Sequence, residues 1–100
     1  MVKHVILWNL KSEFTDSEKE KIKADAKREL EALKGKIPGL IDIKLNISGL
    51  STSNADMMLD SSFESEEALK NYATHPIHVA AADNYVRPFT QSRSCLDYVE

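Results

Sequence analysis

The stretch VKHVILWNL (Val2–Leu10) is rich in Val, Ile, Leu and Trp, and this composition predicts a β-strand. Successive side chains of a strand point to opposite faces. One face would carry a histidine and three apolar residues: His4, Ile6, Trp8 and Leu10. The other face would carry Val5, Leu7 and Asn9. Because both faces are mostly apolar, we expect both to be covered by other parts of the protein.

A helix is predicted directly after this strand. TDSE (Thr15–Glu18) has the form of a capping box, in which Thr15 is the N-cap and Glu18 reaches back to it. The following segment places an apolar stripe at helical spacing: Ile22, Ala26, Leu30 and Leu33. Its other faces carry pairs of opposite charge three or four residues apart, which indicate a solvated surface. Gly35 is expected to end the helix, and IPG (Ile37–Gly39) to turn the chain.

Three further strands are predicted. LIDIKLNIS (Leu40–Ser48) alternates as a half-buried strand does, with four apolar residues on one face: Ile41, Ile43, Leu45 and Ile47. MMLDSSF (Met57–Phe63) would turn Met57, Leu59 and Phe63 to the core and Met58 to the opposite face. SRSCLDYV (Ser92–Val99) is the last strand, and Cys95 within it is expected to be buried.

Two helices are predicted between the third and fourth strands. Ser65 caps the first of them, and its inner stripe holds Leu69, Tyr72 and Ala73. Pro76 disfavours helical geometry at His75, and proline suits the first position of a helix, so we expect the boundary there. The second helix carries an apolar set at helical spacing, with Pro88 limiting its far end: Val79, Ala82, Val86 and Phe89.

The predicted order of elements is β-α-β-β-α-α-β within one domain spanning residues 1–100. This order indicates an α+β, ferredoxin-like fold, in which a four-stranded antiparallel sheet carries helices on one face. The helices can cover only that face. We therefore expect a homodimer in which Val5, Leu7 and Met58 are buried between the two copies.

Composition excludes several classes of partner. The chain has 16 acidic and 13 basic residues, and no basic run is broken by exposed aromatic residues, so we expect no nucleic acid partner. The single cysteine excludes an internal disulfide and fits a reducing compartment. VILW (residues 5–8) is far too short for a signal peptide or a membrane span. These features predict a soluble, cytoplasmic protein without a membrane partner.

YATHPIH (Tyr72–His78) is the stretch most suited to chemistry. If Pro76 is the first residue of its helix, His78 lies in the first turn, where the partial positive charge disfavours imidazolium. A neutral imidazole can act as a general base, and the Tyr72 hydroxyl could polarise a carbonyl. The alternative is structural: Tyr72 is an aromatic at the edge of the core, His75 is the N-cap, and His78 hydrogen-bonds the backbone.

Cofactor and metal sites are not expected. Glycine-rich phosphate loops, Ser-His-Asp signatures and haem motifs are absent from the sequence. His75 and His78 are three residues apart, but Pro76 lies between them, so the two rings are expected to project differently. Asp83 and Asp97 could join them as ligands only by an accident of the fold.

Four segments together resemble the stress-responsive dimeric α/β-barrel (Dabb) family over essentially the whole chain: VKHVILWNL, IPGL, FESEEALKNYATHPIHVAA and RSCLDY. The resemblance implies two sheets packed face to face, with the helices outside. One branch of the family is a plant polyketide cyclase, which closes a ring by an aldol step. Tyr72 and His78 match its tyrosine and histidine, and His4 matches a further pocket histidine. Where that cyclase has aromatic pocket walls, this chain has Ile22, Lys23, Ala26 and Ala81.

The predicted function is acid–base chemistry on a small carbonyl compound, without a cofactor, in which Tyr72 and His78 are catalytic. The expected pocket is lined by His4, Ile6, Trp8, Leu59, His75 and Phe89. The alternative is a non-catalytic stress-response or assembly module, whose dimer is the functional unit. A cofactor-free monooxygenase ranks below both, since nothing in the sequence indicates a quinol-type substrate. A cavity where Tyr72 and His78 converge would favour the enzyme.

Overall fold

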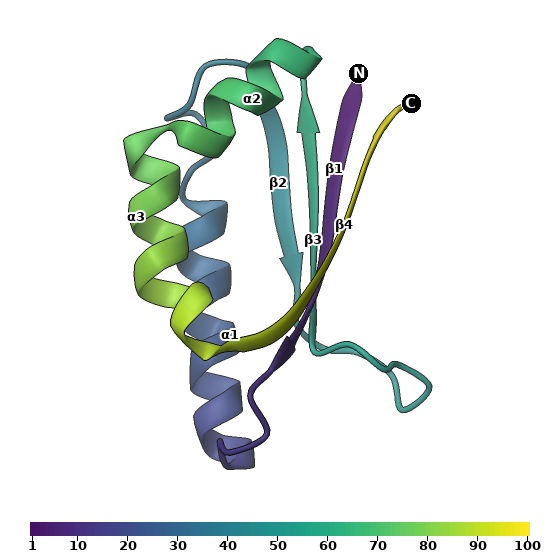
Figure 1. The fold of residues 1–100 in the computed structure, drawn as a ribbon, viewed down its shortest axis with the longest axis vertical. Helices are drawn as coiled ribbons and strands as arrows, with labels where there is room; N and C mark the ends of the chain where they lie inside the picture. Colours follow the sequence, from purple (N-terminus) through teal and green to yellow (C-terminus); the bar gives the residue numbers. More distant parts are fainter.

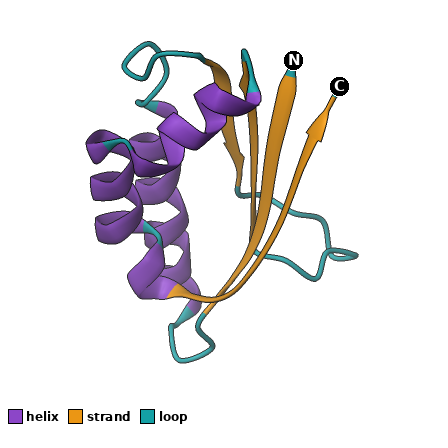
Figure 2. Ribbon diagram, turned by 45° about the horizontal axis from the view of Figure 1, so that its top comes forward, coloured by secondary structure: helices purple, strands orange, loops and turns teal.

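The computed structural model describes all 100 residues as one antiparallel sheet with a layer of helices on one face (Figures 1 and 2). The sheet has the strand order β2-β3-β1-β4. In chain order the elements are β1 (Val2–Leu10), α1 (Asp16–Glu31), β2 (Leu40–Asn46), β3 (Met57–Phe63), α2 (Glu66–Thr74), α3 (Pro76–Tyr85), a 3₁₀ turn (Arg87–Phe89) and β4 (Thr90–Val99). This confirms the predicted α+β, ferredoxin-like fold. No helix is both long and apolar enough to span a bilayer.

Strand β1 forms the centre of the fold, paired to β3 on one side and β4 on the other. Its predicted inner face is buried against the helices: His4, Ile6, Trp8 and Leu10. Leu7, on the opposite face, is 42% exposed. The apolar stripe of α1, consisting of Ile22, Ala26 and Leu30, closes the same core from the helix side. The alternation seen in the sequence therefore correctly separates the two faces of the sheet.

The predicted helix starts are confirmed by their caps. Thr15 and Glu18 form the reciprocal capping box of α1, and Ser65 accepts a hydrogen bond from the Ala68 backbone. The boundary before Pro76 is also confirmed. His75 has extended backbone geometry and its Nδ1 accepts a hydrogen bond from the Ile77 N–H at 3.2 Å. Because Pro76 has no N–H, one donor fewer needs a partner at the start of α3.

The inner face of β2 differs from the prediction at its start. Ile41 was expected to face the core, but it is 40% exposed, and Leu40 is buried instead. The pairing to β3 shifts between Leu40 and Asp42, so Ile41 is an extra residue in a β-bulge. The extra residue of a bulge moves the side chains on one side of the bulge to the opposite face of the sheet. Strict alternation along the sequence therefore cannot predict that Leu40 faces the core.

Helix ends and the last strand also depart from the prediction. Helix α1 ends at Glu31, four residues before Gly35, and α3 ends at Tyr85, with Phe89 in the 3₁₀ turn. In α2 the buried small residue is Ala68, whereas Ala73 is exposed. Cys95 is exposed rather than buried, because no helix covers β4, the edge strand on which it lies.

Gly39 is required by both its backbone conformation and its packing. It has φ +83°, and an added Cβ would lie 2.4 Å from the Ala68 Cβ. We expect Gly39→Ala to lower the free energy of unfolding by about 2–4 kcal/mol, since left-handed strain and overpacking add. Gly35→Ala is the matched control. Gly35 has the same φ with nothing near its Cβ, so about 1–2 kcal/mol is expected. Equal losses in urea unfolding would contradict the packing argument.

Two charged residues of α1 contact the free edge of β2. Lys27 Nζ donates to the Leu45 carbonyl at 2.9 Å, and the Leu45 N–H donates to Glu31 Oε2 at 2.9 Å. The two side chains also pair with each other at 2.7 Å. Since β2 is an edge strand, these backbone groups have no neighbouring strand to bind. The charge pattern of α1 predicted a solvated surface, but Lys27 and Glu31 bind the backbone N–H and carbonyl of Leu45 at the edge of the sheet.

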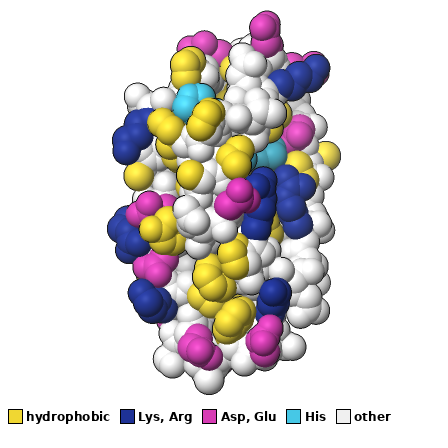
Figure 3. All heavy atoms as spheres, turned by 60° about the vertical axis from the view of Figure 1, so that its left-hand side comes forward, with side chains coloured by type: hydrophobic (Ala, Val, Ile, Leu, Met, Phe, Trp, Pro, Cys, Tyr) yellow, Lys and Arg dark blue, Asp and Glu magenta, His cyan; other side chains and the backbone are white.

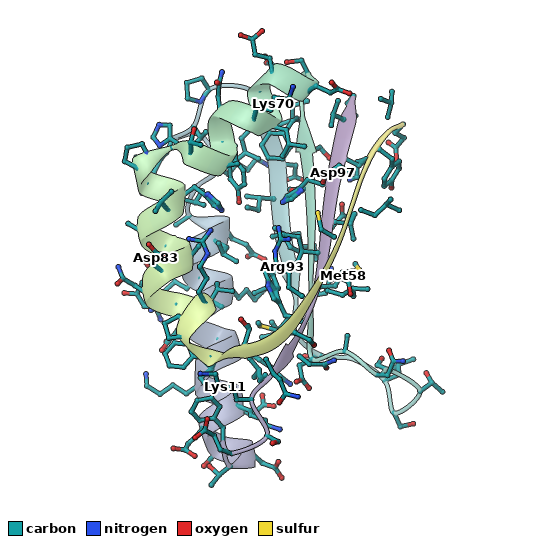
Figure 4. All side chains as sticks on the ribbon, in the orientation of Figure 1. Lys11, Met58, Lys70, Asp83, Arg93 and Asp97 are labelled. Carbon is teal, nitrogen blue, oxygen red and sulfur yellow. The ribbon has the colours of Figure 1, made fainter.

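The face of the sheet away from the helices has no cover in the protomer. It carries five apolar side chains, of which Leu7, Leu96 and Tyr98 are 42%, 65% and 41% exposed: Val5, Leu7, Met58, Leu96 and Tyr98. We call this set the open face. Met58 lies on the opposite side of the sheet from Arg93 (Figure 4). The loop between β2 and β3 projects beyond the open face and carries Leu50, which is 79% exposed (Figure 1).

Candidate functional site

A cavity of about 160 Å³ lies between the inner face of the sheet and the helices. Six of the residues predicted for the site line it: His4, Ile6, Trp8, Leu59, Tyr72 and His78. Strand β1 contributes the first three, and β3, α2 and α3 contribute one each. The sheet and both helices after β3 thus meet at one small space, which we call the Tyr72 cavity.

Tyr72 lies on the buried face of α2 and is 1% exposed. Its ring makes edge contacts with Phe63 and His4, at centroid separations of 4.9 Å and 6.2 Å. Its hydroxyl is buried and has no hydrogen-bond partner in the protein. Burial raises the pKa of the Tyr72 phenol far above its ordinary value, so the hydroxyl remains a neutral donor. An unpaired buried hydroxyl costs about 1–3 kcal/mol, and a bound ligand or water would relieve this cost.

His78 is the third residue of α3, and its ring lies against Tyr72 with centroids 4.1 Å apart. Its Nδ1 is 3.2 Å from the Ala73 carbonyl oxygen. A carbonyl can only accept, so this contact assigns the proton to Nδ1 and leaves the Nε2 lone pair free. Burial lowers the pKa of the imidazole below its ordinary value. Arg87 and His4 lower it further, whereas the Ala73 bond and Asp83 oppose the shift.

The lowered pKa of His78 predicts an NMR titration midpoint below 6.5, the ordinary value for histidine. As pH falls through that value, the unfolded chain takes up the proton before the folded protein does. Stability associated with His78 is therefore fully present above pH 6.5 and is lost as pH falls toward the folded midpoint. The signal is assigned by its loss in His78→Gln. A midpoint at or above 6.5 would contradict a partly buried, neutral imidazole.

His4 connects the Tyr72 cavity to the last strand. Its Nδ1 hydrogen-bonds the Asp97 carboxylate, which also accepts from the Cys95 thiol at 3.4 Å. The sequence did not predict this cluster, because it depends on β1 and β4 pairing with His4 opposite Asp97 and Ile6 opposite Cys95. The sequence contained one signal for it: Cys95 and Asp97 are two residues apart on a strand, so their side chains must point to the same face. Partial desolvation and Asp97 raise the pKa of the Cys95 thiol, although Arg93 acts to lower it, and the raised pKa argues against a nucleophilic thiolate.

Two residues predicted for the pocket lie outside it. His75 is occupied as the N-cap of α3. Phe89 packs on Phe14, with centroids 5.9 Å apart, because the 3₁₀ turn carries it away from the stripe of α3. The sequence also missed two arginines that line the cavity, Arg87 and Arg93. Figure 3 shows basic side chains next to a histidine on the face of the molecule that it draws.

The two arginines differ in their partners. Arg87 pairs with Asp83 at 2.5 Å, one turn earlier on the chain. Arg93 forms no ion pair. It projects from β4 toward the helix side of the sheet, in register with Trp8 (Figure 4). The cavity therefore combines a neutral base, a neutral donor and an arginine that forms no ion pair.

Comparisons with known proteins agree with this architecture. A dimeric protein of unknown function with a ferredoxin-like fold, from Bacteroides fragilis, is 33% identical, with 97% of this chain and 93% of that chain covered and a TM-score of 0.90. A Dabb family protein from Mesorhizobium loti is 23% identical, with 99% and 95% covered and a TM-score of 0.75. A hydroxynitrile lyase from Passiflora edulis is 19% identical, with 97% and 90% covered and a TM-score of 0.72.

No curated protein sequence matches this chain significantly. The family model for the stress-responsive A/B barrel domain, Dabb, matches residues 2–100. Its match covers every helix and strand of the structure. The chain belongs to the Dabb family of stress-responsive A/B barrel domains.

Proposed function

We propose that the protein catalyses reversible carbon–carbon bond chemistry at the carbonyl group of a small molecule, with His78 as general base and Tyr72 as hydrogen-bond donor. The observation that carries this proposal is the buried, unpartnered Tyr72 hydroxyl in the cavity that His78 also lines. A donor held without a partner in a low-dielectric site is suited to an oxygen that gains negative charge during reaction.

The chemistry follows from the states of the two side chains. In the condensing direction, Nε2 of His78 takes a proton from carbon next to a carbonyl. Tyr72 donates a hydrogen bond to the enolate oxygen, and the enolate carbon then attacks a second carbonyl. The proton on His78 returns to the alkoxide so formed. In the cleaving direction, Nε2 takes the hydroxyl proton, the carbon–carbon bond breaks to give a carbonyl compound and an enolate, and His78 returns the proton to the enolate carbon. Both directions use a neutral imidazole, which is the form that burial favours.

The size of the cavity limits the substrate. Its volume of about 160 Å³ is close to that of cavities that hold one benzene molecule, and it is below the range of about 300–1,000 Å³ for drug-sized ligands. A long-chain polyketide does not fit a space of this size. Arg93 has no ion pair and supplies a positive charge for a carboxylate on the substrate. The proposed substrate class is thus a small carbonyl or β-hydroxy carbonyl compound, preferably carboxylated.

The test is a panel of small β-hydroxy ketones and hydroxynitriles, each in a neutral and a carboxylated form, with aldehyde release as the readout. Hydroxynitriles are included because a structurally similar protein is a hydroxynitrile lyase. In parallel, carbonyl-containing fragments are screened for their effect on the His78 titration. If no compound turns over and no fragment shifts His78, the proposal fails, and the non-catalytic module becomes the better description.

We also propose a homodimer formed through the open face. Its exposed apolar side chains have no cover in the protomer, and Leu50 on the projecting loop extends the same surface. The relative from Bacteroides fragilis is described as dimeric. Packing two open faces together would bury Leu7 and Met58 between two sheets. The single cysteine fits a reducing compartment, so we place the dimer in the cytoplasm, which cell fractionation would test.

A further inference from the structure

Three potential metal ligands converge on the helix side of β1 and β4. They are the imidazole of His4, the thiol of Cys95 and the carboxylate of Asp97, and their ligand atoms all lie within 4.8 Å of one another. Cys95 and Asp97 are two residues apart on β4, so their side chains share a face, and both pair directly with β1. The pairing of the two strands therefore brings all three side chains together. The metal site dismissed from the sequence involved other histidines, around Pro76.

We propose that His4, Cys95 and Asp97 form a binding site for a divalent transition-metal ion of the zinc class. The separations between the ligand atoms support this. Metal–ligand distances of about 2.0–2.3 Å around a tetrahedral ion place sulfur about 3.5 Å from the nitrogen and oxygen ligands. In the structure the Cys95 sulfur is 3.7 Å from His4 Nδ1 and 3.4 Å from Asp97 Oδ1.

The third separation needs one adjustment. His4 and Asp97 are in direct hydrogen-bond contact, so the carboxylate must move outward by roughly 1 Å for an ion to enter. Asp97 can do this, because its side chain is 45% exposed and belongs to an uncovered edge strand. His4 remains in place, since its ring is held between Phe63 and Tyr72.

The chemistry of the set fits zinc or cobalt(II) better than magnesium or calcium, which prefer oxygen ligands. A thiolate and a carboxylate would neutralise the two charges of the ion. The fourth position opens on a hollow between β4 and α2, lined by Leu69, Lys70 and Ala73. A water molecule can therefore complete the coordination. His4 also lines the Tyr72 cavity, so the site adjoins it without using Tyr72 or His78.

Cobalt(II) provides the direct test, with the thiol kept reduced. We expect the wild-type protein to bind one ion per protomer and to show a near-ultraviolet sulfur-to-cobalt charge-transfer band together with visible bands of four-coordinate strength. Zinc should displace the cobalt and abolish both. Cys95→Ser should remove the charge-transfer band. Asp97→Asn should weaken binding at least about tenfold, since loss of even an outer-shell partner costs about 10–100-fold.

The matched control moves the thiol to the other side of the same strand. The double variant Cys95→Ser/Ser94→Cys keeps one exposed cysteine on β4 but turns it to the face of Leu7, which pairs with position 94. The proposal predicts no four-coordinate spectrum from this variant. Two results would overturn it: an equal spectrum from the double variant, or no cobalt binding by the wild type at millimolar metal. In either case the three side chains form only a hydrogen-bonded group in which Asp97 orients His4.

Discussion

Tyr72→Phe is expected to lower turnover by about 10²–10³-fold while leaving the fold intact. This is the effect of removing one donor to a developing oxyanion. The hydroxyl makes no hydrogen bond in the protein, so its removal breaks no contact and should not lower the free energy of unfolding. His78→Gln should lower turnover by about 10²–10⁴-fold through loss of the base. The measurements are kcat on the best substrate of the panel and urea unfolding of each variant.

Tyr85→Phe is the matched control for Tyr72→Phe. Tyr85 is the last residue of α3 and does not line the Tyr72 cavity, so it should retain full activity. A Tyr72→Phe protein with unchanged kcat would refute the donor role. A Tyr72→Phe protein that is inactive and also unfolded would indicate that Tyr72 is needed for structure, contrary to its unpartnered hydroxyl.

Leu7→Asp is expected to convert the proposed dimer into folded monomers. Leu7 is 42% exposed in the protomer, so aspartate at this position is hydrated and does not disturb the core. In the dimer the same charge would lie between two sheets, where an unpaired charge costs several kcal/mol. At 1.4 kcal/mol per factor of ten, the dissociation constant should rise by roughly 10³-fold. Sedimentation velocity at micromolar concentration measures the change.

Ile77→Asp serves as the control for this substitution. Ile77 is also 42% exposed, but it lies on α3, in the layer of helices on the other side of the molecule. It should leave the dimer unchanged. A wild-type monomer, or a Leu7→Asp protein that still sediments as a dimer, would contradict a dimer formed through the open face.

Local signals were sufficient for most of the fold. Alternation separates the two faces of β1, and the capping residues Thr15 and Ser65 start their helices where predicted. Pro76 correctly divides α2 from α3. The errors share one cause, which is tertiary pairing that the local pattern does not contain. The bulge at Ile41 depends on how β2 pairs with β3, and the exposure of Cys95 depends on which strands the helices cover.

The candidate site was predictable where one segment supplies it. Tyr72 and His78 belong to consecutive helices joined at Pro76, so their shared location follows from the sequence. Arg93 and Asp97 could not be assigned, because their places opposite Trp8 and His4 require the register between the first and last strands. His75 was assigned to the pocket, but its ring caps α3 by accepting a hydrogen bond from the Ile77 N–H, as the structural alternative proposed.

The contacts that Lys27 and Glu31 make with Leu45 have a consequence for how copies of this chain can gather. An exposed strand edge is a template to which a strand of another molecule can add, and repeated addition leads to open-ended polymers. At Leu45 both backbone groups are already bound by side chains of α1. An incoming strand would have to displace an ion pair to bind there. Intermolecular strand addition is thus opposed at Leu45 on the β2 edge, and the β4 edge has no such side-chain cover.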